Sequence, residues 1–332
     1  MNLQDIAKLS KDLYTNKALS FNEKSGQDVM REVFFNVLGV PAGTTGQNML
    51  TAFNKNRYDV YQVISTALTA AIPAGVKGKY DNLANTLVIG FSDVARFTNR
   101  NRDLFRVALI AAGTQDLRRQ EKLDAYYTLE TDKYGVKVYT ELEQFLNGQT
   151  DWTDYVDRIR ESFENFVGER IYDAITKAYN ALSTPYKENN TGSFDVDKTL
   201  ALAERVSAKA NAPVAIYGTV SALNKLTGGI QSSDNMKDEK NQYGYLKTFN
   251  GIPLIAIPQG LKNGKDEFAI SDKALLVIPN GEKVVDVALK GDVLVVDAPA
   301  TEHNALQPEY LVQYEIGVAA RKAAVFGVSV IS

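Results

Sequence analysis

The sequence predicts an α+β fold, and three observations lead to that prediction. A helical pattern of unusual length covers residues 151–182, strand-like segments cluster on both sides of it, and these strands do not alternate with helices along the chain. Regular alternation would instead favour a parallel α/β sheet. At 332 residues, the chain is long enough to bury a substantial core and to form two or more lobes.

The helical pattern of Asp151–Leu182 is the strongest in the sequence. Its apolar residues recur every three or four positions, which places them on one side of an α-helix roughly 48 Å long. Gly168 is its weak position and a candidate kink, because a glycine inside a helix costs about 1 kcal/mol relative to alanine. The side predicted to face solvent carries Asp154, Arg158, Arg160, Glu161, Glu164, Glu169, Asp173 and Lys177.

Residues 1–83 are predicted to form an N-terminal helical arm. Apolar stripes with helical spacing lie within residues 3–13, 29–38 and 48–71, and breaks separate them. Two arrangements are open. The helices pack on the rest of their own chain as a subdomain, or they extend across a neighbouring subunit.

Residues 84–148 are predicted to form a long two-stranded excursion with a charged tip at 113–122. An isolated hairpin is marginally stable in water, so a protruding one needs a second surface to pack on. Nothing nearby in the sequence supplies that surface. Branched and aromatic residues predict strands at 86–91, 104–110, 125–129 and 134–139.

The chain after the long helix is predicted to mix short helices and strands. Helical spacing occurs in 194–210 and 219–226, whereas polar residues predict loops at 183–193 and 230–244, the second of them mobile. The predicted strands are 213–217, 252–257, 268–270, 274–278, 283–287 and 292–296, followed by a β-rich end at 309–331.

Composition argues against several classes of protein. A net charge of −3 gives no general attraction to nucleic acid or to anionic membranes. The chain has no cysteine, which removes disulfides and thiolate metal sites and fits folding in a reducing cytoplasm. The first residues do not form a signal-peptide pattern, and no run of about 18 apolar residues predicts a transmembrane helix.

The sequence also lacks recognisable catalytic motifs. His303 is the only histidine, so a histidine-based triad would have to use it. Zinc and calcium lack their usual ligand patterns, and the glycines of 260–265 are too close together for a phosphate loop. We therefore expect no enzyme, no cofactor and no catalytic, cofactor-binding or metal site. Carboxylate pairs among the 40 acidic residues are not excluded by pattern.

A local basic run with interleaved aromatic residues is a candidate for phosphate contact. We favour a solvated face or a salt-bridging surface between subunits. The run consists of Arg96, Arg100, Arg102 and Arg106, with Phe97 and Phe105 between them.

The order of features along the chain resembles that of a known family. The strand-like segment 134–142 leads through Gly148 into the long helix, the segments 212–218 and 243–254 follow, and strands close the chain. In this order the sequence is similar to the major capsid proteins of tailed bacteriophages, which have the Hong Kong 97-type fold. The resemblance covers residues 84–331, and its specificity lies in the order, because each piece alone is weak.

The resemblance implies a division of the chain. It consists of a leading arm, an extended hairpin called the E-loop, a spine helix, a peripheral P-domain and a central A-domain. The implied boundaries are 1–83 for the N-terminal helical arm, 84–148 for the E-loop hairpin and flanking strands, 149–210 for the P-domain with spine helix 151–182, 211–308 for the A-domain and 309–332 for the closing P-domain strands.

The resemblance also implies a function and partners. The protein would be the major head protein of a tailed double-stranded DNA bacteriophage, forming hexamers and pentamers of an icosahedral virion shell that is assembled in the host cytoplasm. The shell would enclose DNA without sequence-specific binding, with portal and scaffold or decoration proteins as partners and no membrane. Two alternatives are open: an encapsulin-like nanocompartment shell, and a hydrolase or sugar-modifying enzyme that uses unmarked carboxylates.

The charged hairpin tip is predicted to contact a neighbouring subunit, because a protruding hairpin has little to contact in its own chain. We expect Arg118, Arg119 and Lys122 to meet acidic residues there, with Glu161 and Glu164 as the candidate partners. Reversing the three basic charges should abolish particle assembly in negative-stain microscopy, while circular dichroism reports a folded subunit. An unchanged particle yield would contradict the contact.

Overall fold

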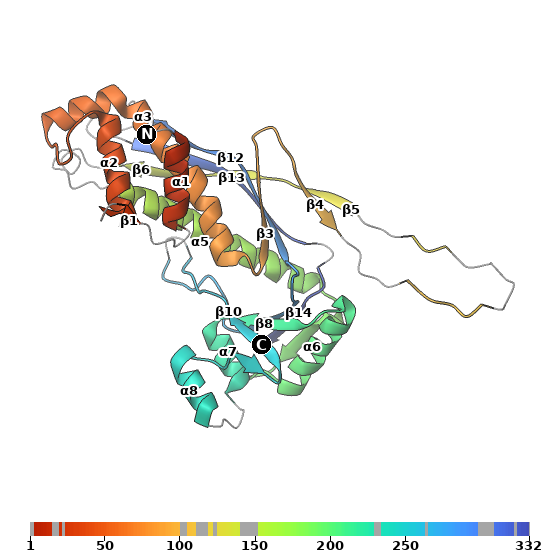
Figure 1. The fold of residues 1–332 in the computed structure, drawn as a ribbon. Coiled ribbons are helices and arrows are strands. Elements are labelled where there is room, and N and C mark those ends of the chain that lie inside the picture. The colour runs from red at the N-terminus through yellow and green to blue at the C-terminus, as the bar shows by residue number, and fades with distance from the viewer. Residues whose placement is uncertain are drawn as a thin grey trace.

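The structure of the protein is a computed structural model, which describes residues 3–14, 20–21, 24–99, 105–110, 119–121, 125–139, 152–228, 234–262, 265–297, 309–321 and 324–331. These residues form two lobes and a hairpin that extends to one side (Figure 1). The helices are α1 (Leu3–Tyr14), α2 (Gly26–Leu38), α3 (Gln47–Tyr80), α5 (Trp152–Ala181), the 3-10 helix η1 (Thr184–Tyr186), α6 (Val196–Ala210), α7 (Val220–Thr227) and α8 (Asp234–Tyr243). The strands are β1 (Ser20–Phe21), β2 (Lys24–Ser25), β3 (Ala84–Ile89), β4 (Ala95–Asn99), β5 (Ala125–Leu129), β6 (Asp132–Tyr139), β7 (Lys187–Asn190), β8 (Val214–Gly218), β9 (Thr248–Phe249), β10 (Ile252–Ala256), β11 (Ala274–Pro279), β12 (Val285–Asp297), β13 (Glu309–Ala320) and β14 (Gly327–Ile331).

The first lobe is a layer of helices on a four-stranded sheet. The strand order is β3-β12-β13-β6, with β3 parallel to β12 and the other neighbours antiparallel. α3 and α5 lie across one face of this sheet (Figure 1). Their apolar sides, including Ile64 and Leu68 of α3 and Val167 and Ile171 of α5, are buried in one continuous core with the sheet. The helical spacing of these residues is what allows one side of each helix to be buried.

A bulge in β12 is tied to α3 by two hydroxyl groups. The register between β12 and β13 shifts between Lys290 and Leu294, so Val293 lies outside the regular ladder. Ser65 donates a hydrogen bond from its hydroxyl to the Val293 carbonyl, and the Thr69 hydroxyl oxygen accepts one from the Val293 N–H at 2.8 Å. Because Ser65 and Thr69 are one helical turn apart, one face of α3 satisfies both backbone groups of the bulge.

The closest approach of α3 and α5 requires a glycine on each helix. A Cβ atom at Gly75 of α3 would overlap the carboxylate of Glu164 in α5, and one at Gly168 of α5 would overlap the phenol of Tyr80 in α3. Glu164 is fully buried at this crossing and pairs with the Lys79 ammonium at 2.6 Å. Because a buried carboxylate needs a partner, this pair favours one placement of α5 on α3.

β4 and β5 form the base of the extended hairpin. They pair antiparallel, from Ala95 opposite Leu129 to Asn99 opposite Ala125. Phe97 of β4 packs with Ala288 of β12 in a small apolar cluster of its own. Residues 105–110 and 119–121 lie beyond this base, on the part of the hairpin that extends from the body (Figure 1).

The second lobe is a six-stranded sheet in the order β7-β14-β11-β8-β10-β9, and α6 and α7 pack against it around a second core. Asp195 caps α6 and Thr219 caps α7, in each case with a side-chain oxygen that accepts backbone N–H bonds. Asn250 and Gly251 both have positive φ, which suits the two-residue turn between β9 and β10. These local signals explain where α6 and α7 begin and where the chain turns from β9 into β10.

Many predicted elements are confirmed. The long helix is present as α5, the helices after it as α6 and α7, and predicted strands as β3, β5, β6, β8, β10, β11, β13 and β14. α5 is helical through Gly168, the candidate kink position. This glycine makes room for Tyr80.

Two strand predictions are wrong, and two predicted strands are joined into one. Residues 105–110, which include most of the predicted strand 104–110, form no strand, and β4 lies earlier in the chain. Residues 268–270 contain only an isolated bridge from Phe268 to Leu261. The two strands predicted at 283–287 and 292–296 are one strand, β12, because the bulge lets the chain continue along the same partner.

Both polar segments predicted as loops contain regular structure. Residues 183–193 include η1 and β7, and β7 is polar because it is the outermost strand of its sheet, parallel to β14. Residues 230–244 include α8, which has no buried residue, and the buried residue of β7, Asn190, is polar. Neither segment therefore carries the apolar periodicity on which a prediction from sequence relies.

The predicted division of the chain also differs from the lobes. α3 lies in the core of the first lobe, and Ser10 of α1 donates a hydrogen bond to the Ala67 carbonyl of α3 at 2.9 Å. The described helices before residue 83 therefore pack on their own chain, while the predicted boundaries of the N-terminal arm stay a prediction. α6 and β14 belong to the second lobe and β12 to the first, because strand pairing between distant segments decides membership.

The helix crossing leads to a testable prediction. Gly75→Ala should destabilise the unassembled subunit by about 1–3 kcal/mol, because its methyl group must displace the buried Glu164 carboxylate. Gly78→Ala is the matched control in the same helix, since no atom lies within 4 Å of a Cβ atom built there. It should stabilise by about 0.5–1 kcal/mol through helix propensity. Urea unfolding followed by circular dichroism measures both, and equal effects of the two substitutions would refute the tight crossing.

Candidate self-assembly surfaces

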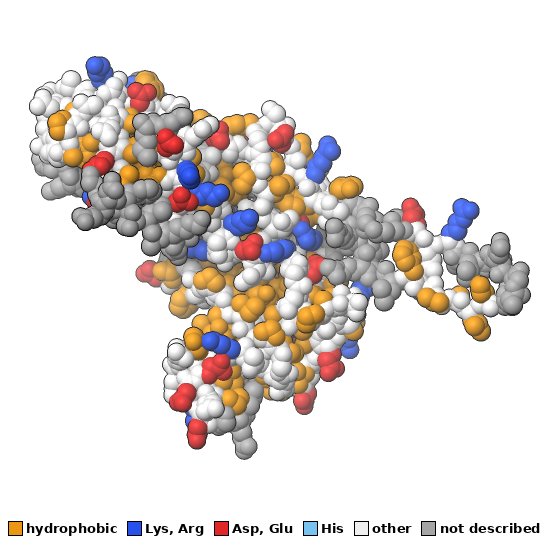
Figure 2. All heavy atoms as spheres, viewed as in Figure 1, with side chains coloured by type: hydrophobic (Ala, Val, Ile, Leu, Met, Phe, Trp, Pro, Cys, Tyr) orange, Lys and Arg blue, Asp and Glu red, His pale blue; other side chains and the backbone are white. Residues whose placement is uncertain are grey.

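The extended hairpin presents apolar side chains to solvent. Val107 is 98% exposed and Leu109 is 104% exposed, and Phe105 and Ile110 are each about half exposed. Figure 2 shows hydrophobic side chains along this projecting segment, away from the body. Scattered exposed apolar residues are ordinary, but several together on a projection are typical of a surface that is covered by a partner.

The two sides of the hairpin are joined beyond the β4–β5 ribbon. The Gln120 side chain accepts a hydrogen bond from the Arg106 N–H at 2.7 Å and donates one to the Arg106 carbonyl at 2.8 Å. A side-chain amide thus takes the place of a paired backbone group. This contact holds the described parts of the two sides together where no strand is formed.

A buried carboxylate anchors the base of the hairpin to the body. Asp286 of β12 is fully buried and accepts two hydrogen bonds from the Arg321 guanidinium, at 2.8 and 3.2 Å. It also accepts bonds from the Asn85 amide at 3.1 Å and from the Tyr127 hydroxyl of β5. Four donors on three other strands or their flanks satisfy this carboxylate, as a buried charge requires.

Tyr127 connects this anchor to the hairpin. Its ring stacks on Phe97 of β4, with ring centroids 5.9 Å apart. Burial, together with the neighbouring Asp286 carboxylate, raises the pKa of Tyr127, so the phenol stays protonated and donates at neutral pH. The base of the hairpin is therefore fixed to the body. Farther out, the side chains of Val107 and Leu109 are not covered by the described part of their own chain.

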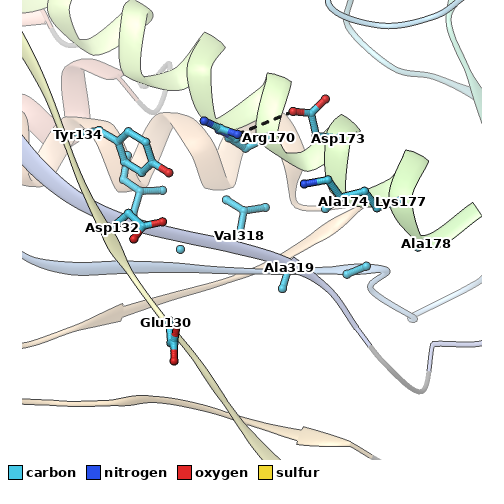
Figure 3. Close-up of a pocket in the computed structure, with 13 residues that line it drawn as sticks. Glu130, Asp132, Tyr134, Arg170, Asp173, Ala174, Lys177, Ala178, Val318 and Ala319 are labelled. Carbon is cyan, nitrogen blue, oxygen red and sulfur yellow. Dashed lines mark ion pairs between the residues drawn. The ribbon is translucent and has the colours of Figure 1, made fainter. Parts of the chain in front are cut away.

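A groove between α5 and the edge of the first sheet is a second candidate surface (Figure 3). It encloses about 500 Å³ and carries charges of both signs. Arg170 lies 3.9 Å from the Asp173 carboxylate, and its guanidinium also stacks over Phe166 at 5.1 Å from the ring centroid. The residues lining the groove are Glu130, Asp132, Tyr134, Arg170, Asp173, Ala174, Lys177, Ala178, Ile316, Gly317, Val318, Ala319 and Ala320.

The five residues predicted to make an intersubunit contact differ in how the structure places them. Arg118 and Lys122 lie outside the described residues, whereas Arg119 is exposed on the hairpin. Glu161 is exposed on α5, with its carboxylate 3.4 Å from Arg160. Glu161 and Arg119 therefore stay available for a contact between copies.

Glu164 is not available as a surface partner, and its predicted place on the solvent side of the helix is wrong. Its side chain has no exposed area and pairs with Lys79 and Arg160 of its own chain. Helical spacing alone did not predict the burial of Glu164, because α3 covers a side of α5 that carries few apolar residues in the sequence pattern.

The sequence prediction missed Asp286 and Tyr127. They are 159 positions apart, so no local pattern links them. One signal was present, since Asp286 is a lone acid in the apolar run Val284–Val287, and an acid in a buried strand needs a partner.

The described residues contain no cluster of three or more side chains that could hold a metal ion. Within the same residues, no helix is long and apolar enough to cross a membrane. His303, Arg100 and Arg102 lie outside the described ranges, whereas Arg96 and Arg106 are exposed.

Solved capsid structures share this fold. The chain is similar to the capsid of a native GTA particle, with 10% sequence identity and a TM-score of 0.55, over 76% of this chain and 90% of that one. It is also similar to the capsid of Cyanophage P-SCSP1u, with 13% sequence identity and a TM-score of 0.52 over 76% of this chain and 88% of that one. The mature capsid of bacteriophage PhiM1 is similar at 11% identity and a TM-score of 0.51, over 76% of this chain and 86% of that one. At these identities the likeness establishes the fold, which is of the Hong Kong 97 type.

The fold together with a matching family model defines the class: this is a major capsid protein of the tailed-bacteriophage type, which builds the virion shell from copies of itself and is not an enzyme. The family is given by a model described as "SPbeta prophage-derived putative capsid protein YonB", which matches residues 6–329. The chain belongs to this family. No curated protein matches its sequence. The nanocompartment and hydrolase alternatives are not favoured by these findings.

The anchor of the hairpin leads to a testable prediction. Tyr127→Phe should destabilise the subunit by about 1–3 kcal/mol, because the buried Asp286 carboxylate loses a donor. Tyr126→Phe on the same strand is the control, since Tyr126 is 76% exposed and should leave stability unchanged. Thermal unfolding of the unassembled subunits compares the two. Equal stability of both variants and the natural protein would show that the hydrogen bond does not anchor the hairpin.

Proposed function

We propose that this chain forms hexamers and pentamers that close into an icosahedral shell around double-stranded DNA in the host cytoplasm. The first lobe corresponds to the P-domain, the second to the A-domain, and the β4–β5 hairpin to the E-loop. The exposed apolar side chains of that hairpin carry the proposal, because Val107 and Leu109 are almost fully exposed and would be covered by a neighbouring copy.

Acidic residues on the neighbour's spine helix and groove complement the basic residues of the hairpin. Arg119 is exposed near the hairpin tip, and Glu161 is exposed on α5. The groove next to α5 adds the carboxylates of Glu130, Asp132 and Asp173, beside the cations Arg170 and Lys177. We propose that Arg118, Arg119 and Lys122 meet these carboxylates on the next copy, with Glu161 rather than Glu164 as the partner on the helix.

This contact is heterologous, since the hairpin of one copy meets a different surface on the next. Contacts of that kind repeat around an axis instead of closing as a pair, which is how rings of five or six subunits arise. Each interface is modest, but a closed shell has many of them per subunit, so the assembly is stable through multivalency.

The proposed contents and partners follow from charge and class. A net charge of −3 suits a container whose wall does not adhere strongly to packed DNA. Portal and scaffold or decoration proteins are the further partners that we propose, since a DNA-filled head needs an entry point and a defined size.

A substitution in the hairpin tests the assembly mechanism. Val107→Ser with Leu109→Ser should reduce the yield of shells at least about tenfold, because the contact loses its apolar part at every copy. The control is Leu294→Ser with Val296→Ser, which removes partly exposed apolar side chains from β12 of the body. Sedimentation and negative-stain microscopy measure particle yield, and circular dichroism checks folding. Normal yield from the hairpin variant would overturn the mechanism.

The contents of the particles test the rest of the proposal. Purified particles from a phage-producing host should contain double-stranded DNA. Particles that instead enclose a cargo enzyme and no DNA would favour the nanocompartment alternative.

A further inference from the structure

The helix α8 is stabilised by little of its own chain. It has ten residues, none of them buried, and isolated helices of this length are marginal in water. It lies on a protruding part of the second lobe, where Figure 1 places it at the far end from the first lobe. A cation–π contact joins it to the following segment: Lys247 lies over the Tyr243 ring, with its ammonium 3.7 Å from the centroid.

The charges of α8 are segregated around its axis. At roughly 100° per residue, Lys237 and Lys240 lie together on one flank of the helix, the basic flank. Asp238 and Glu239 lie together on the other, the acidic flank, and the midpoints of the two pairs are about 180° apart. The third acid of the helix, Asp234, lies between the flanks and forms an exposed ion pair with Lys237 at 3.0 Å, which is a weak interaction that a contact with another copy can replace. Lys237 and Asp238 are exposed, and Glu239 and Lys240 are partly exposed. Figure 2 shows acidic and basic side chains gathered on this end of the lobe.

This arrangement fits a contact with a second copy of the same chain. A two-fold pair that used one flank would bring like charges together, which is unfavourable. A head-to-tail contact instead brings the acidic flank of one copy against the basic flank of the next. Each copy then has one flank for each neighbour, so the contact repeats around a rotation axis.

We propose that the α8 helices of successive copies form a ring held by ion pairs between the basic flank of one copy and the acidic flank of the next. The occupant of each flank is thus another copy of this chain. The inference rests on the proposed function, since it requires subunits arranged in closed rings, and it assigns one contact within those rings to named residues.

Reciprocal charge reversal tests the ring. Variant one is Lys237→Glu with Lys240→Glu, variant two is Asp238→Lys with Glu239→Lys, and variant three combines all four substitutions. Variants one and two make both flanks carry the same sign, so each should reduce shell yield at least about fivefold in sedimentation and electron microscopy. Variant three exchanges the flanks and should restore the yield. Co-expression of variants one and two should also restore it, because their subunits can alternate.

The outcomes separate this inference from the proposed function. If the natural chain forms shells and variants one and two do so equally well, the ring contact is wrong and the proposed function stands. If variants one and two fail and variant three also fails, with helix content unchanged in circular dichroism, the charges do not pair between copies and the inference is overturned. If the natural chain forms no closed particles, the proposed function and the ring contact are both overturned.

Discussion

The close crossing of α3 and α5 is the constraint on which the rest of this structure depends. Gly75 and Gly168 let the helices approach, and Glu164 fills the space between them as a fully buried carboxylate paired with Lys79 and Arg160. A buried charge that loses its partners is strongly destabilising, so such a pair penalises any sliding of one helix on the other. The two helices thereby act as one rigid layer over the first sheet.

That rigid layer determines what the other parts can do. It supports β12 through the Val293 bulge, and β12 in turn holds the hairpin through Asp286 and Tyr127. The hairpin is thus fixed at its base and lacks a covering surface at its outer part, where Val107 and Leu109 are exposed. A subunit built in this way gains burial by meeting other copies, which is the property that a shell protein needs.

Solved capsids that are only 10–13% identical to this chain share its fold. A fold of this kind is preserved by burial patterns and strand pairing, which many sequences satisfy. The surfaces that decide contacts between copies are more specific to a chain. In this chain the proposed contact surfaces are the outer part of the hairpin, where Val107 and Leu109 are exposed, and the helix α8, which has no buried residue.

The sequence by itself determined the α+β class, the long helix α5, the order of most strands and the resemblance to phage capsid proteins, because periodic burial and element order are written along the chain. Only the tertiary structure decided that Glu164 is buried, that Asp286 binds Tyr127 and Arg321, that α3 belongs to the core and that β12 and β14 lie in different lobes. These features join residues far apart in the chain, and a pairing of that kind leaves no local pattern. The physical reason is that burial of a charge or an edge strand depends on what arrives from elsewhere to cover it.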